Sequence, residues 1–175
     1  MSVLDELNKF GKRVVKESKT SLTKKKKNAS KSLYNSIAYD AKVSKNSFEL
    51  SFEMEDYGKF IDKGVKGAGG TKADGTKWNK KRVTNNLYKY TNKRPPAKVF
   101  NSWIVKRGIA PRNTKGQFTS RRGLQFAIAN SVYHTGLETT NFFTKPFESA
   151  FKSLPDDLIK AYGLDVDRLL KNAIQ

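Results

Sequence analysis

Apolar residues recur every three or four positions through the start of the chain, the spacing of one face of a helix. This stripe and the lysines opposite it predict an amphipathic helix over roughly the first 25 residues. The helix is expected to end near the lysine run at 24–27, where positive charge suits a helix carboxyl terminus. A short helical turn is expected within 30–36. The members of the stripe are Leu4, Leu7, Gly11, Val14, Val15, Ser18 and Leu22.

The period then changes to two, which is typical of strands with one buried face. A turn of sequence SKNS separates two such runs, and polar residues such as Glu49, Glu53 and Glu55 alternate with the apolar ones of the second run. We therefore predict an antiparallel hairpin whose apolar side is covered by the first helix, in an α+β fold. The apolar face consists of Ile37, Tyr39, Ala41, Val43, Phe48, Leu50, Phe52 and Met54.

After the hairpin, Tyr57, Phe60 and Ile61 are spaced as on one face of a short helix. Asp56 is placed to cap its start and Gly64 to close its end. We expect the three apolar side chains to pack beneath the hairpin.

Four glycines follow closely, at positions 64, 67, 69 and 70, and raise the question of a phosphate-binding loop. The G-x-x-x-x-G-K-[ST] pattern fails because Gly70 stands where the lysine is needed. The G-x-G-x-x-G pattern fails because Lys72 replaces its third glycine. We interpret the glycines as a flexible exit from the packed body.

The exit leads into a basic excursion at 66–93, which is rich in Gly, Lys, Thr and Asn and is expected to hold little regular structure. Trp78, Tyr88 and Tyr90 are isolated aromatic residues within it. They could stack on bases, but aromatic residues in an insertion more often pin the loop to its own domain or to a neighbour.

Helical spacing resumes after Pro96, which suits a first helical position, and a glycine at 108 ends this segment. A basic turn pivots on Gly116. Ser120 is expected to cap the next helix, which ends at Gly136. The inward residues of the two helices are predicted to be Val99, Phe100, Trp103 and Ile104, then Leu124, Ala127, Ile128 and Val132.

The carboxyl-terminal part begins with a packing block of phenylalanines at 142, 143, 147 and 151. Pro155 and the two aspartates after it start a last helix, in keeping with the helix dipole. We expect that helix to break at Gly163, restart at Asp165 and continue through leucines 169 and 170. The whole chain, 1–175, is predicted to form a single domain with the excursion 66–93 inserted in it.

Composition adds a strong positive charge to this picture. The 175 residues carry a formal charge of +19, and 37% of them are hydrophobic, as expected of a globular chain. Residues 59–122 hold 18 Lys or Arg against two acids, a net +16, while the last 38 residues hold six acids against five bases. Such asymmetry predicts contact with a polyanion. No run approaches the ~18 apolar residues of a membrane span, and the start lacks a signal-peptide core, so we expect a soluble protein.

The sequence offers few residues that could form a catalytic or metal-binding site. The chain has no cysteine and one histidine, His134, which excludes thiolate chemistry and leaves no second imidazole for a metal set. Glu53, Glu55, Asp56 and Asp62 could in principle hold magnesium, but alternation places the glutamates on a solvated strand face. We therefore expect no enzyme and no cofactor.

The order of these segments resembles the tail-completion or neck proteins, the head-tail connectors, of tailed double-stranded DNA bacteriophages. The likeness covers Met1 to Val65 and Arg94 to Ala173, and it is carried by SLYNSIAYDAKV, YGKFIDKGVKG, WIVKRGI and FFTKPFESAFKSLPDDLIKAY. The excursion is a departure from the compact family pattern. Matched by position, the structural anchors are Tyr57, Phe60, Gly64, Phe143, Pro146 and Phe147, to which we add Trp78 as an assembly anchor.

This resemblance implies a virion protein that is assembled in the host cytoplasm and forms a homo-oligomeric ring of about six or twelve copies. Its implied partners are a portal or adaptor protein, tail or tail-hub proteins, and genomic DNA passing non-specifically. The alternatives are a non-specific DNA-binding monomer or dimer and, more remotely, a magnesium-dependent nuclease. Basic residues expected at the DNA channel or an interface are Lys24, Lys25, Lys26, Lys27, Lys77, Lys80, Lys81, Arg82, Arg94, Arg107, Arg112, Lys115, Arg121 and Arg122.

Overall fold

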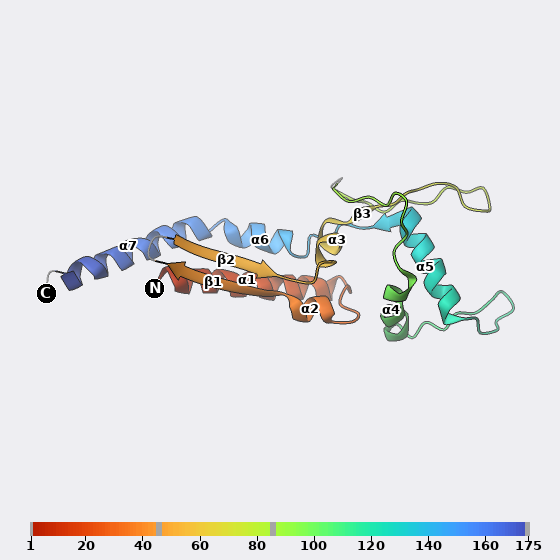
Figure 1. Ribbon diagram of the computed structural model, residues 1–175, viewed down its shortest axis with the longest axis horizontal. Coiled ribbons are helices and arrows are strands. Elements are labelled where there is room, and N and C mark those ends of the chain that lie inside the picture. The colour runs from red at the N-terminus through yellow and green to blue at the C-terminus, as the bar shows by residue number, and fades with distance from the viewer. Residues whose placement is uncertain (1, 45–46, 85–86, 174–175) are drawn as a thin grey trace. The chain divides into compact units, whose positions relative to one another are not determined.

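The computed structural model describes the backbone of residues 2–44, 47–84 and 87–173, and side chains up to residue 163 (Figure 1). Its contacts divide the chain into two compact units, each described by itself below. Unit 1 contains 1–27, 32–55 and 142–175, and unit 2 contains 28–31 and 56–141.

Unit 1 has the predicted α+β architecture: a hairpin packed by a long amino-terminal helix and by carboxyl-terminal helices. The strands pair in antiparallel register, with Tyr39 opposite Phe52 and Ala41 opposite Leu50. The predicted apolar residues thus share one face, but Val43 and Phe48, paired near the turn, are 47% and 55% exposed, so the prediction that this face is buried is wrong at that end. Residues 45 and 46 of the SKNS turn lie outside the described residues. The elements are α1 (Val3–Lys24), α2 (Ser32–Ser36), β1 (Ala38–Ser44), β2 (Ser47–Glu53), α6 (Thr144–Phe151) and α7 (Leu154–Ala173).

Helix α1 begins with a capping box, in which the Ser2 hydroxyl accepts from the Asp5 backbone N–H and the Asp5 carboxylate accepts from the Ser2 N–H. Leu7, Val14 and Leu22 of the predicted stripe are buried, but Leu4 is 40% exposed. The stripe is shifted toward Val3 and Phe10, which lie in the core, so the exposed Leu4 falls at its edge. Gly11 lets the helix approach β1, because a Cβ there would lie 2.6 Å from Cγ of Tyr39.

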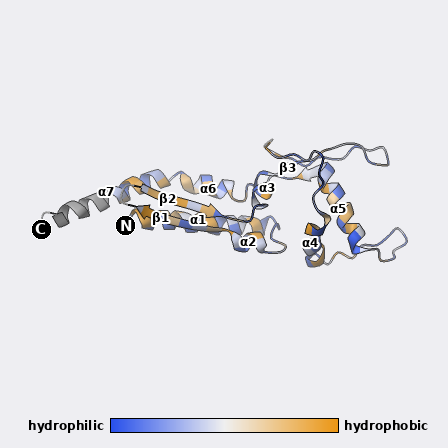
Figure 2. Cartoon of the chain, viewed as in Figure 1, coloured by the Kyte–Doolittle hydropathy of each residue, from blue (hydrophilic) through white to orange (hydrophobic). Residues whose placement is uncertain are grey.

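An aromatic cluster forms the core where α1, β2 and α6 meet. The Phe52 ring lies 5.4 Å from that of Phe143, 5.9 Å from Phe147 and 6.2 Å from Phe10, all edge to face. Phe142 is fully buried, and Phe151, although 48% exposed, stacks on Phe147 at 5.7 Å, so the predicted packing block is confirmed. Figure 2 shows apolar residues, coloured orange, along these elements.

Helix α7 runs unbroken from Leu154 to Ala173, so the predicted break at Gly163 is wrong. A glycine inside a helix costs about 1 kcal/mol relative to alanine, which weakens the helix without ending it. Aspartates 156 and 157 lie in its first turn, as predicted. The side chains of leucines 169 and 170 lie outside the described residues.

Unit 2 is arranged around α5, whose end leads into a two-residue strand that pairs with β3. As predicted, the described part of the excursion holds little regular structure: one end of β3 and isolated bridges. The elements of unit 2 are α3 (Gly58–Lys63), β3 (Val65–Lys66), the 3-10 helix η1 (Ala97–Phe100), α4 (Asn101–Lys106), α5 (Arg121–Thr135) and β4 (Gly136–Leu137).

The short helix α3 differs from its prediction at its start. Asp56 is not its cap: Tyr57 holds the N-cap position with helical backbone angles, makes no side-chain capping bond and is 39% exposed. Phe60, which we expected beneath the hairpin, packs edge to face on Tyr88 of the excursion at 4.8 Å. Gly64 does end α3, since its N–H donates to the Phe60 carbonyl at 2.9 Å with φ of 78°.

The later helices of unit 2 keep their predicted ends but not every predicted face. Ser120 caps α5, and glycines 108 and 136 follow the last turns of α4 and α5. Pro96 precedes a 3-10 turn rather than entering an α-helix. Val99 is 58% exposed and Ala127 is also exposed, whereas Ala129, one position further round the helix from Ile128, is buried.

Candidate functional site

Positive charge is concentrated in unit 2. Unit 2 holds 19 Lys or Arg against four acids, a net +15, while unit 1 holds 16 against 12, a net +4. All the basic residues singled out from the sequence are exposed, from Lys24 in unit 1 to Arg122 in unit 2. The predicted set is therefore available to a ligand, but it is shared between two units, with only Lys24–Lys27 in unit 1.

Two loops of unit 2 end in turns with the same hydrogen-bond pattern, and we call 71–77 tip 1 and 112–118 tip 2. In tip 1 the Lys72 N–H donates to the Thr76 carbonyl at 2.7 Å, and the Gly75 N–H donates to the Lys72 carbonyl at 3.0 Å. Thr71 and Lys77 form the bridge that closes the loop.

Tip 2 repeats the pattern position by position. The Asn113 N–H donates to the Gln117 carbonyl, and the Gly116 N–H donates to the Asn113 carbonyl, both at 2.9 Å. Arg112 and Phe118 close the loop. Figure 1 shows both as long loops that extend beyond the helices of unit 2. Unit 2 thus presents two similar basic turns to solvent.

A side-chain oxygen supports each turn from within. In tip 1 the Asp74 carboxylate accepts from the Thr76 N–H at 2.9 Å and from its hydroxyl at 2.6 Å, and these bonds lower the pKa of Asp74. In tip 2 the Asn113 side-chain oxygen accepts from the N–H groups of Lys115 and Gln117, each at 3.0 Å. These Asx-type turns fix the loop ends locally, without help from a hydrophobic core.

Several basic side chains of unit 2 lie over aromatic rings. The Arg112 guanidinium is 4.1 Å from the centre of the Phe118 ring, which is 69% exposed. One N–H group of this guanidinium donates to the Gly116 carbonyl at 2.9 Å, and the remaining edge N–H groups suit contact with phosphate oxygens. Further pairs are Lys72 with Trp78, Arg94 with Tyr133, Arg107 with Trp103 and Arg122 with Phe126.

The aromatic residues of the excursion pin it to its own unit. Trp78 stacks on His134, with ring centres 5.0 Å apart and planes within 4°, and Tyr90 packs on Tyr133 at 5.9 Å. Burial raises the pKa of Tyr90. Besides this stacking, the Nδ1 atom of His134 contacts the Gly69 carbonyl. The only histidine therefore serves to hold the loop, and Trp78 is engaged in the same contact.

The glycine segment is a close contact rather than a free exit. The N–H groups of Ala68 and Gly69 donate to the Tyr133 and His134 carbonyls, each at 2.9 Å. A Cβ at Gly67 would lie 2.5 Å from the Thr135 carbonyl carbon, and closer to the His134 carbonyl oxygen. The interpretation as a flexible exit is therefore wrong: the segment lies against the end of α5, where only glycine leaves room for the backbone.

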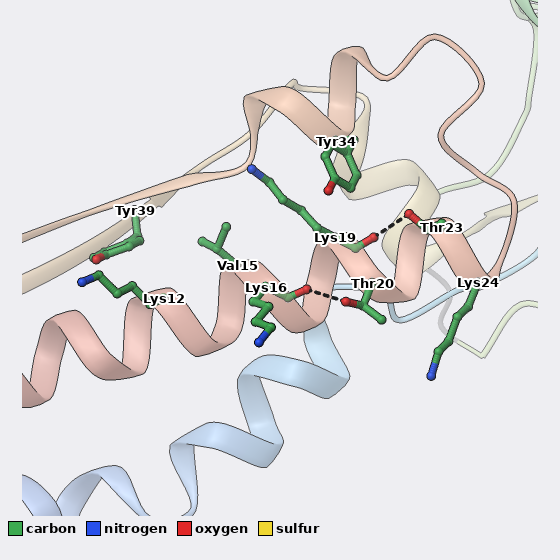
Figure 3. A pocket seen from close by; sticks show the side chains of 9 residues that line it. All are labelled: Lys12, Val15, Lys16, Lys19, Thr20, Thr23, Lys24, Tyr34 and Tyr39. Atoms are coloured by element: carbon green, nitrogen blue, oxygen red, sulfur yellow. Dashed lines mark hydrogen bonds between the residues drawn. The ribbon is translucent and has the colours of Figure 1, made fainter.

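A groove in unit 1 gathers lysines from the side of α1 that lies opposite the apolar stripe (Figure 3). It measures about 530 Å³, and we call it the lysine groove. Lys24 is its one member from the predicted set. The others, Lys12, Lys16 and Lys19, are spaced at i, i+4 and i+7 along α1 and belong to the lysine-bearing face that the amphipathic pattern predicts. The groove is lined by Lys12, Val15, Lys16, Lys19, Thr20, Thr23, Lys24, Tyr34 and Tyr39.

The residues matched by position to the neck-protein pattern lie in the packing of the two units. Phe143 and Phe147 belong to the aromatic core of unit 1 and Pro146 is buried beside them. Phe60 and Gly64 pack and end α3 in unit 2, as described above.

The described residues contain no group of three or more His, Cys, Asp or Glu arranged to hold a metal ion. Glu53 and Glu55 are exposed, as predicted, whereas Asp62 is 4% exposed with Lys63 at 3.8 Å. The helices that the structure describes include none long and apolar enough to cross a membrane. Comparison with known proteins found no matching family model, curated protein or solved structure.

Proposed function

We propose that the protein is a non-enzymatic structural component of a bacteriophage virion, forming a ring at the portal-tail junction around the DNA exit channel. The carrying observation is the segregation of charge, with +15 of the +19 on unit 2 and two exposed basic turns among its loops. Positive charge that needs no fixed spacing suits sequence-independent contact with phosphates. In this proposal unit 1 supplies the body of the protomer, and unit 2 meets DNA or an adjacent subunit.

The segment order that resembles neck proteins also supports the proposal, because its anchors, apart from the exposed Tyr57, have structural roles rather than forming a reaction site. Phe143, Pro146 and Phe147 contribute to the aromatic core, and Gly64 ends a helix. Portal or adaptor proteins on one side and tail or tail-hub proteins on the other are the proposed partners. Six or twelve copies, roughly, would be expected in the ring.

Mass measurement tests the ring. We expect sedimentation velocity and electron microscopy to show closed oligomers, either for the protein alone at high concentration or after addition of the portal protein encoded with it. A chain that stays monomeric in both conditions and never binds portal refutes the proposal.

The charge of unit 2 favours one alternative, a DNA-binding protein that acts as a monomer or dimer. That alternative predicts tight binding of random-sequence duplex at physiological salt, with log affinity falling linearly as log salt rises. Fluorescence anisotropy with a labelled duplex distinguishes the two: strong binding by a species that never forms rings favours the alternative. Absent binding eliminates the alternative and leaves the ring.

The loop tips give this assay a sharper form. Changing Arg112 and Lys115 to glutamine should reduce the salt slope by about two if both side chains contact phosphates. The matched control changes Lys145 and Lys152 to glutamine, which removes the same charge from exposed positions of unit 1. Equal losses in both variants would mean that net charge, rather than the tips, governs binding.

A further inference from the structure

We propose that the lysine groove of one copy receives the outward face of α7 from a second copy, in a head-to-tail contact. This inference rests on the proposed ring and identifies the surfaces that would build it. Both surfaces belong to unit 1.

The groove combines an apolar floor with a positive rim. Val15, Tyr34 and Tyr39 supply the apolar part, and Lys19 lies 5.3 Å from the centre of the Tyr34 ring. In Figure 3 the Lys19 side chain extends across the space between Val15 and Tyr34, and Lys12 lies below the Tyr39 ring.

The threonine hydroxyls of the groove are hydrogen-bonded within helix α1. Thr20 and Thr23 donate to the backbone carbonyls four residues before them, at 2.9 and 3.0 Å. Among the described residues, no carboxylate forms an ion pair with any of the four lining lysines. The groove therefore suits an occupant that brings both apolar surface and negative charge.

Helix α7 carries such a surface on its outward face. Ile159 is 71% exposed and Tyr162 is 67% exposed, one helical turn apart. Asp156 lies one turn before Ile159 and is exposed as well. The exposed Lys160 lies next to Ile159, one turn after Asp156, so this face carries one positive charge as well. The opposite face of α7 packs on α1 through Leu158 and Ala161, so within its own chain the helix turns Asp156, Ile159 and Tyr162 away from α1.

The two surfaces match as a helix and a helix-binding groove do. Two apolar side chains at i and i+3 meet the Val and Tyr floor, while the acidic first turn meets the lysine rim. A nucleic acid could pair with the lysines, but it would leave Ile159 and Tyr162 uncovered. A second copy accounts for both surfaces. It also supplies the attraction that two strongly basic chains need in order to associate.

The geometry of such a contact leads to an assembly. The groove and α7 are different surfaces of one chain, so in the head-to-tail arrangement that we propose each copy still offers its own α7 to a further copy, and repetition closes a ring or extends a filament. A two-fold dimer would instead use the same pair of surfaces twice and stop.

Charge reversal tests the contact in the full-length chain. The groove variant carries Lys12→Glu and Lys19→Glu, and the helix variant carries Asp156→Lys and Asp157→Lys. Each alone should weaken self-association at least ten-fold in sedimentation equilibrium. An equimolar mixture should recover association, because the acidic groove of one variant faces the basic helix of the other.

The matched control carries Lys98→Glu and Lys106→Glu, at exposed positions of unit 2. It makes the same change in net charge as the groove variant and should associate as well as the wild type, or better, because mutual repulsion falls. A weakened groove variant beside an unweakened control thus cannot be explained by net charge.

The outcomes separate this inference from the proposed function. Wild-type rings together with an unaffected groove variant overturn the inference and leave the ring. A wild-type chain that stays monomeric with and without portal refutes both. If the groove variant associates normally but loses binding to a labelled oligothymidine of about 20 nucleotides, the groove is a nucleic-acid site and the inference is wrong.

Cysteine cross-linking gives an independent readout, because the natural chain has no cysteine to interfere. The double variant Thr20→Cys, Ile159→Cys should form a ladder of disulfide-linked species under mild oxidation, with circular dichroism confirming that it is folded. Each single variant should yield dimers at most. A double variant that yields no product beyond dimer overturns the head-to-tail arrangement.

Discussion

Replacing Gly67 by alanine should destabilise unit 2 selectively. The added Cβ would lie 2.5 Å from the Thr135 carbonyl carbon and 2.6 Å from the Gly136 nitrogen, so it meets backbone atoms that cannot rotate away. The glycine segment must then move off the end of α5. Two hydrogen bonds follow directly after Gly67, from the N–H groups of Ala68 and Gly69, and both are at risk.

The expected cost combines two effects. Overpacking against a rigid neighbour costs about 1–3 kcal/mol. Weakening the two backbone hydrogen bonds adds about 0.5–1.5 kcal/mol for each bond that is lost. If both bonds are lost we therefore expect a loss of about 2–6 kcal/mol in the free energy of unfolding, which is a large part of the ~5–15 kcal/mol that holds a typical domain together.

Urea denaturation followed by tryptophan fluorescence is the appropriate assay, because both tryptophans, Trp78 and Trp103, lie in unit 2. The fluorescence midpoint should fall, while the part of the circular dichroism signal that comes from unit 1 changes less. Gly123→Ala is the control. Its Cβ would meet nothing within 4 Å in α5, and it should gain about 0.5–1 kcal/mol. A Gly67→Ala midpoint equal to that of the wild type would refute the close contact.

Two further changes test other parts of the structure. Phe52→Ala removes the ring shared by Phe143 and Phe147 and should cost about 3 kcal/mol in circular dichroism melts; a loss under about 1 kcal/mol would contradict the aromatic core. For Asp74, hydrogen bonds from Thr76 lower the pKa, so the turn is favoured above the ordinary aspartate pKa and loses this support as pH falls through the lowered one. The Thr76 amide resonance should therefore titrate with a midpoint below that of a free aspartate, and an ordinary midpoint would show that these bonds do not form in solution.

The sequence predicts unit 1 well because its elements carry their own periodicity. A spacing of three and four over α1, and of two over the hairpin, indicates which residues share a face, and the pairing of Tyr39 with Phe52 agrees with these faces. The errors fall where tertiary packing decides. Leu4 has the correct spacing but lies at the edge of the contact with the hairpin and α7. Gly163 is a different case, because α7 continues through it although none of the other segments that the structure describes packs at that position.

Unit 2 is harder to predict because its order comes from contacts between segments distant in sequence. Nothing local in the glycine segment indicates that it meets Tyr133 and His134, more than 60 residues later. The similarity of the two tips is equally hidden, because tip 1 places its supporting side chain at Asp74 and tip 2 at Asn113, in different positions of the turn. Composition predicts the positive charge of unit 2, whereas the arrangement of its loops depends on hydrogen bonds between segments that are distant in the sequence.

The two units expose different kinds of surface, and a final prediction follows from this difference. The acidic and apolar surfaces that suit self-association lie in unit 1, and most of the excess positive charge lies in unit 2. If each unit has the role proposed for it, the groove variant should lose assembly while its salt slope for DNA, measured per monomer, stays the same. The variant with glutamine at Arg112 and Lys115 should show the reverse. A single set of changes that abolishes both properties would mean that DNA binding and assembly use one surface, and that the charge of unit 2 serves contacts between copies.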